Sequence, residues 1–203
     1  MITVVYFWQI KKVFLPIAIL FMAFHKFALM RLPGVSFVKL LGTGKGDSFT
    51  LKDANPYRWG ALVTIKETHL DILDNSKVIR QWKKIAKQEY RAILKPVSVH
   101  GLWSGKQPFD VEKLDWNGKI AAITRARIVW RKNVVFWRAV PPVTISLHQS
   151  PGLINAIGIG EAPIGLQGTF SLWESATHLR EFAYKGQAHT QAIKATEENK
   201  WYS

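Results

Sequence analysis

An internal repeat constrains the fold of this sequence more than any other feature. In each copy a Pro-Gly pair (Pro33-Gly34, Pro151-Gly152) comes just before an apolar strand, which a second strand and then a helix follow. An apolar helical stretch, 13–30 in the first copy and 133–147 in the second, precedes each Pro-Gly pair, and a further strand precedes that stretch. The predicted strands are 3–8, 35–42 and 58–65 in the first copy and 119–129, 153–160 and 166–173 in the second. The order β-α-β-β-α is that of a ferredoxin-like unit.

The predicted fold is therefore α+β, with two tandem ferredoxin-like units whose antiparallel sheets pack into a single barrel-type domain. The boundaries are 1–103 for the first unit, 104–118 for a linker and 119–203 for the second. Within the first unit we expect a long basic helix at 68–90 and a completing strand at 92–99. Hydrophobic residues make up 48% of the chain, enough for a sizeable core.

The composition restricts the chemistry. The formal net charge of +14 favours anionic partners, although a basic solvated surface explains it equally well. Because the chain has no cysteine, disulfides, iron–sulfur clusters and a thiolate haem ligand are excluded. Ferredoxin-like units also occur in RNA-recognition modules, but the sequence GTFSLW (168–173) is a poor match to the RNA-binding octamer, so nucleic acid is an unfavoured partner.

The N-terminal apolar run, 13–24, has three interpretations. It differs from a signal peptide because Lys11 and Lys12 follow ten largely apolar residues. It is shorter than a membrane-spanning helix before His25, and Pro16 lies within it. A helix packed on its own sheet suits the length best, and its basic flanks allow an additional peripheral contact with an anionic membrane surface. We expect a cytoplasmic protein, with that contact at the inner face of the membrane.

Six histidines are the main candidates for chemistry, and no pair of them has metal-chelating spacing: His25, His69, His100, His148, His178 and His189. No G-x-S-x-G nucleophile elbow occurs either. One helical histidine that faces an apolar, aromatic cavity would suit an axial haem ligand, and His178 and His189 both remain open for that role. Arg125 and Arg127 lie on one face of a predicted strand; they suit a carboxylate or propionate if they point inward, and they only solubilise the surface if they point outward.

Several longer motifs resemble the spheroidene monooxygenase (carotenoid 2-ketolase) family. They are spread over most of the chain: RLPGVSFVKLLGTGKG (31–46), VHGLWSGKQPF (99–109), ITRARI (123–128), FWRAVPP (136–142), PGLINAIGIGEAPIGLQGTFSLWES (151–175), REFAY (180–184) and KWYS (200–203). The resemblance implies a haem b monooxygenase that uses O₂ and an external electron donor such as a ferredoxin. Its substrate would be an acyclic carotenoid, hydroxylated first and then oxidised again at the same carbon to a ketone.

A wider similarity to the dimeric α+β-barrel haem proteins suggests the site. In those proteins a strand-end Trp, a helix aromatic and a helical His follow one another, and Trp173, Phe182 and His189 stand here in that order. The similarity implies His189 as the iron ligand, with His178 as the alternative, and Trp173, Phe182, Arg125 and Arg127 around the cofactor. The competing hypotheses are a cofactor-free oxygenase barrel, a binding module for apolar ligands or nucleic acid, and a structural membrane-associated protein.

Overall fold

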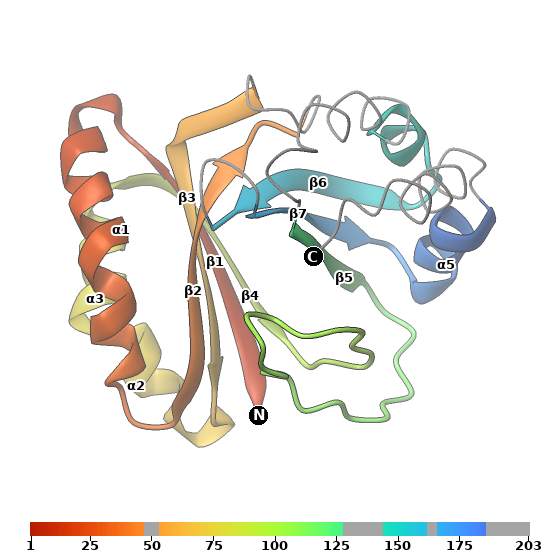
Figure 1. The fold of residues 1–203 in the computed structure, drawn as a ribbon, viewed down its shortest axis with the longest axis horizontal. Coiled ribbons are helices and arrows are strands. Elements are labelled where there is room, and N and C mark those ends of the chain that lie inside the picture. The colour runs from red at the N-terminus through yellow and green to blue at the C-terminus, as the bar shows by residue number, and fades with distance from the viewer. Residues whose placement is uncertain (47–52, 128–143, 162–165, 186–203) are drawn as a thin grey trace. The chain divides into compact units, whose positions relative to one another are not determined.

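A computed structural model describes residues 1–46, 53–127, 144–161 and 166–185 of the chain. The chain divides into two compact units, each with its own strands and helices (Figure 1). The first comprises Met1–Leu41 and Pro56–Asp115, and the second comprises Gly42–Asn55 and Trp116–Ser203. The segment 42–55, which the sequence boundaries assign to the first unit, therefore groups with the second.

The first unit is an antiparallel sheet with its helices on one face (Figure 1). Its strands lie in the order β4-β1-β3-β2. The elements along the chain are β1 (Ile2–Ile10), a 3-10 helix (Lys12–Phe14), α1 (Leu15–Met30), β2 (Val35–Gly44), β3 (Ala54–Ile65), a 3-10 helix (Glu67–His69), α2 (Leu70–Asp74), α3 (Lys77–Ile85) and β4 (Ala86–Leu94). The mixed α+β fold expected from the repeat is confirmed.

Aromatic stacking organises the core of this unit. Alternate residues of β1 point toward the helices, so Tyr6 and Trp8 lie side by side with ring centroids 5.3 Å apart. Trp8 in turn stacks on Trp82 of α3 at 5.0 Å, and both indoles are fully buried. Phe21 of α1 meets the edge of Trp82 at 5.3 Å. This row of aromatic rings thus joins the sheet to α1 and α3.

Two predictions in this unit are wrong. The helix expected at 68–90 is interrupted after Asp74 and ends at Ile85, and Ser76 caps its second part by accepting a hydrogen bond from the Ile79 amide at 3.3 Å. The strand expected at 92–99 is β4, which starts at Ala86 and ends at Leu94. It pairs with β1 as the edge strand of its sheet, and pairing along β1 overrides the helical pattern of its sequence.

The second unit repeats the arrangement with β5 (Ile120–Arg127), β6 (Leu153–Gly160), β7 (Leu166–Trp173) and α5 (Ala176–Lys185). Strand β7 lies between β6 and β5, antiparallel to both. The last residues of β2 pair with β6 through Gly42↔Gly160 and Thr43↔Ile159. The predicted bounds of β6 and β7 are confirmed. Most of the helix expected at 133–147 lies outside the described residues, and 144–148 are helical.

Candidate functional site

The two copies share one histidine position. In the first unit the ring of His69 lies against Gly34, whose φ is +77°, and a methyl group there would come within 2.9 Å of Cγ of His69. In the second unit the ring of His178 lies against Gly152, whose φ is +74°, and a methyl group there would collide with it. The same turn conformation and the same ring contact therefore recur after each Pro-Gly pair.

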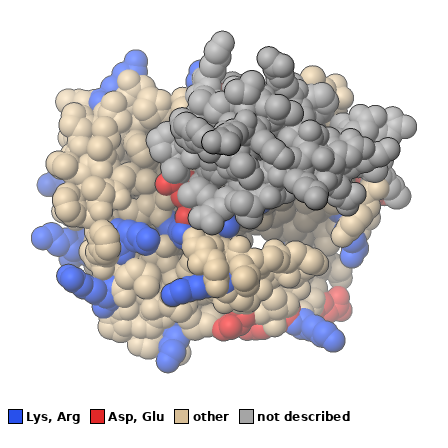
Figure 2. All heavy atoms as spheres, viewed as in Figure 1, with Lys and Arg blue, Asp and Glu red and all other residues tan. Residues whose placement is uncertain are grey.

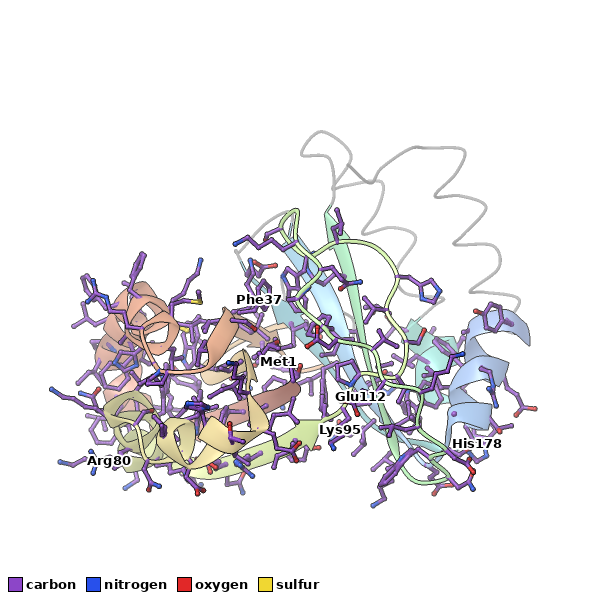
Figure 3. All side chains as sticks on the ribbon, turned by 90° about the horizontal axis from the view of Figure 1, so that it is seen from below. Met1, Phe37, Arg80, Lys95, Glu112 and His178 are labelled. Carbon is purple, nitrogen blue, oxygen red and sulfur yellow. The ribbon has the colours of Figure 1, made fainter. Side chains whose placement is uncertain are left out.

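Hydrogen bonds around the two histidines recur as well. The amide of Lys66 donates to the Gly34 carbonyl at 3.0 Å, and the amide of Glu174 donates to the Gly152 carbonyl at 2.8 Å. Nδ1 of His178 lies 3.1 Å from Oγ of Ser175, near the beginning of α5, where Figure 3 labels the histidine. Each of the two histidines therefore packs on a glycine that has a positive φ, and this contact is common to both copies.

Trp173 and Phe182 come together on the helix-covered face of the second sheet. Their ring centroids are 5.3 Å apart, and Trp173 is fully buried. The indole Nε1 of Trp173 donates to Oγ of Ser171 at 2.9 Å. Leu147, Ala156 and Leu179 complete this cluster. The predicted pair is therefore adjacent, with Phe182 packed in the core between α5 and the sheet.

Arg125 lies on the opposite face of the same sheet. It pairs with Gly168, five residues from Trp173 along an unbroken ladder, and an odd separation on a strand reverses the face. The neighbouring row on this face consists of Ile123, Phe170 and Ile157, which are aligned across the three strands. Ile157, Ile159 and Phe170 are all buried. Arg125 thus sits at the edge of an apolar strip.

Glu161, which the sequence interpretation did not consider, is the charge partner of Arg125. The guanidinium Nη2 is 3.0 Å from Oε1 of Glu161, and both side chains are largely buried. Arg125 is on β5 and Glu161 follows β6, so the ion pair spans the central strand β7. Gly168, the β7 residue paired with Arg125, has no room for a side chain, because a methyl group there would collide with the backbone of Thr124. An acid directly after an apolar, glycine-rich strand was the available sequence signal.

The first unit has different chemistry at the equivalent position. In the second unit Arg125↔Gly168 is the sixth pair of the β5–β7 ladder, counted from Ile120↔Trp173. In the first unit the sixth pair of the β1–β3 ladder is Phe7↔Gly60, so the two pairs are equivalent. A methyl group at Gly60 would come within 2.8 Å of the Phe7 ring. Both copies therefore have a glycine at this position. Its partner is the buried ring of Phe7 in the first unit and the guanidinium side chain of Arg125 in the second. We take the apolar strip with Arg125 and Glu161 as the candidate functional site.

The structure separates some of the predicted site residues and leaves others open. Arg125 lies on one face of the sheet, while Trp173 and Phe182 lie on the other. The backbone register puts Arg127 in line with Arg125, but its side chain and the whole of His189 lie outside the described residues. Within the described ranges no three His, Cys, Asp or Glu side chains form a metal-binding cluster.

Comparison with solved structures identifies the fold class. Tandem ferredoxin-like units with antiparallel sheets are the architecture of the dimeric α+β-barrel class. Among solved structures, an aldoxime dehydratase in complex with butyraldoxime is similar with a TM-score of 0.53. The match covers 97% of this chain and 74% of that one at 10% sequence identity, so the likeness concerns the fold alone. No protein-family model matches the chain.

Curated relatives give the family. The spheroidene monooxygenase of Rhodobacter capsulatus is 33% identical over 177 residues, which cover 84% of this chain and 73% of that protein. The spheroidene monooxygenase of Cereibacter sphaeroides is 34% identical over 185 residues, 89% of this chain. The chain belongs to the spheroidene monooxygenase family, and this supports an oxygenase role. It spans 57% of the length of the Cereibacter protein.

Proposed function

We propose that this chain is a haem-dependent monooxygenase that inserts oxygen from O₂ into an acyclic carotenoid. The family membership supports the reaction class, since both relatives described above are named spheroidene monooxygenase. The observation that carries the proposal within the chain is the guanidinium of Arg125 at the edge of a buried apolar strip, where the other copy has a phenyl ring. An amphiphilic cofactor with carboxylates and an apolar body needs that combination.

The described residues fit a haem in part. Ile123, Ile157 and Phe170 offer an apolar surface, and Arg125 offers a bidentate partner for a propionate. Glu161 already accepts from that guanidinium, so a propionate would have to share it or displace the carboxylate. The ring of His178 is packed on Gly152, which argues against its turning toward a cofactor, although its Nδ1 contact with Ser175 leaves Nε2 for a metal. We assign the ligand role to His189, which follows Trp173 and Phe182 in the order given above.

The cofactor and the residues of the chain would have separate roles in the reaction. A bound haem would supply O₂ activation with two electrons from an external donor such as a ferredoxin. The side chains of Ile123, Ile157 and Phe170 would contact hydrocarbon and exclude water from the reacting carbon. Each hydroxylation consumes one O₂, two electrons and two protons and releases one water. A second hydroxylation of the same carbon gives a gem-diol, which loses water to form the ketone.

Reconstitution with haemin tests the cofactor. We expect the wild-type chain to show a Soret band that His189→Ala abolishes and His178→Ala retains. His69→Ala is the matched control, because His69 occupies the equivalent position in the first copy. Loss of the band only in His178→Ala would move the ligand to that residue. A wild-type chain without any Soret band would refute the haem mechanism.

Turnover is measured separately. The purified chain, a reductase–ferredoxin donor system and spheroidene in detergent are incubated under ¹⁸O₂, and the products are analysed by mass spectrometry. Incorporation of ¹⁸O into a hydroxylated product supports the monooxygenase assignment. Product formation by a chain that binds no haem would instead establish a cofactor-free oxygenase, and label from water alone would refute oxygen insertion from O₂.

A further inference from the structure

The outer face of α1 is an exposed apolar surface. Five side chains at alternating intervals of four and three residues form a stripe along the helix and its preceding turn. Their exposed fractions range from 40% for Ile17 to 76% for Val13, and the other members are Leu20, Phe24 and Phe27. Ile19 and Met30 extend the stripe at its side. Seven exposed apolar side chains gathered on one helix of a folded protein mark a site of interaction.

The inner face of α1 fixes the helix to its own sheet. Ala18, Phe21, His25 and Leu29 recur at three- and four-residue spacing and are buried against the first core. By length and composition the segment Lys12–Met30 could cross a membrane. However, β1 before it and β2 after it belong to one sheet, so α1 is a connection between two of its strands. Spanning a bilayer would require that unit to unfold, whereas lying on a bilayer surface would not.

The surroundings of the stripe are basic. Lys11, Lys12, Lys26 and Arg31 are exposed on the helix or at its ends, and the first acidic residue of the sequence is Asp47. Helix α3, which packs beside α1, adds Lys77, Arg80 and Lys84 on its exposed side. The exposed acids of the helical layer, Glu67 and Asp71, are on the second 3-10 helix and on α2, and none is on α1 or α3. Figure 2 shows a tan, uncharged area on the side of the molecule where α1 lies, with Lys and Arg side chains at its borders.

We propose that α1 docks the chain on the surface of an anionic lipid bilayer. The stripe enters the boundary between headgroups and acyl chains, and the basic rim contacts anionic headgroups. A second copy of the chain is a poor occupant, because a symmetric contact through α1 would bring the two basic rims together. In a cell the surface would be the inner face of the cytoplasmic membrane. Docking depends on neither haem nor turnover, so it can be tested independently of the proposed function.

The test is co-sedimentation of the full chain with vesicles. Two compositions are compared: phosphatidylcholine alone, and phosphatidylcholine with phosphatidylglycerol as about a third of the lipid. The apolar-face variant carries Leu20→Gln, Phe24→Gln and Phe27→Gln, and the rim variant carries Lys11→Gln, Lys26→Gln and Arg31→Gln. The matched control is Leu102→Gln with Leu114→Gln, which removes two exposed apolar side chains outside the stripe. Circular dichroism confirms that each variant is folded.

We expect binding to the anionic vesicles only. The apolar-face variant should lose at least about tenfold in partition coefficient, and the rim variant about fivefold per charge removed. The control should bind as the wild type does. Equal binding of wild type and apolar-face variant would overturn the proposal. So would absence of vesicle binding combined with a concentration-dependent dimer that only the apolar-face variant loses, since that result would assign the stripe to a second copy.

Discussion

Substitution of Gly152 by alanine tests the histidine position that the two copies share. Gly152 has φ of +74°, and a side chain in the left-handed region costs about 1–2 kcal/mol. The new methyl group would also collide with the ring of His178. The ring would have to move and would lose its contact with Ser175, which costs roughly another 1 kcal/mol. We therefore expect Gly152→Ala to lower the free energy of unfolding by about 2–3 kcal/mol.

Three further variants separate the two contributions in urea titrations. Gly101→Ala is the control for backbone strain alone, because Gly101 has φ of +80° and no atom within 4 Å of the added methyl group. It should cost only about 1–2 kcal/mol. The variants His178→Ala and Gly152→Ala/His178→Ala complete a double-mutant cycle. Removing the imidazole relieves the collision, so the two substitutions should cost less together than the sum of their separate effects, by about 1 kcal/mol.

Additivity would refute this reasoning. If the cycle gives a coupling below about 0.5 kcal/mol, the ring of His178 does not rest on Gly152 in solution. The packing that argues against His178 as the iron ligand would then lose its basis, and the histidine would return as a candidate ligand. Repeating the cycle with Gly34 and His69 provides an internal comparison, and the coupling there should have the same sign.

Two other predictions concern buried ionisable groups. Burial lowers the pKa of His25 below its ordinary value of 6.5, so the unfolded chain binds a proton more readily than the folded one. The stability that this pKa difference contributes is complete above pH 6.5 and is lost as the pH falls below it. In the variant His25→Phe, the free energy of unfolding should therefore change less between pH 7 and about pH 5 than in the wild type. An unchanged slope of this free energy against pH would contradict the prediction. Glu161→Gln should cost about 1–2 kcal/mol by leaving Arg125 next to a neutral amide, whereas a loss below about 0.5 kcal/mol in urea titration would show that the ion pair contributes nothing.

The sequence predicts the second sheet better than the end of the first. Strands 153–160 and 166–173 are apolar and are bounded by Gly, Pro and Glu, so local pattern and tertiary position agree. Strand β4 is different because it is the edge strand, and its residues 87–90 are all exposed, so it lacks the alternation of buried and exposed positions that indicates a strand. Lys87 and Arg91 continue the basic pattern of Lys83 and Lys84 in α3, so the sequence suggests one continuous helix. Edge strands tolerate such charges because one side of the strand has no partner.

The candidate site could be predicted only in part from the sequence. The sequence order names Trp173 and Phe182 as neighbours of a cofactor, which stays a prediction; the structure shows that their rings contact each other, because a strand end and the following helix are close in the chain. The partner of Arg125 could not be found in this way, since Glu161 directly follows β6, and β6 is separated from β5 by β7. The alternation of β5 leaves open which face its arginines occupy, and the ladder with β7 supplies that information.

The two copies have different residues, Phe7 and Arg125, at one equivalent position, and this difference bears on how such a protein can evolve. In a barrel built from two identical chains, every substitution appears twice, and a charge placed in one half must be accommodated in the other. Joining the halves in one polypeptide removes that constraint. One copy can keep an aromatic ring over its glycine and preserve the fold, while the other places a guanidinium over its own. Variants at Arg125 should therefore alter ligand binding while the first half of the molecule stays intact.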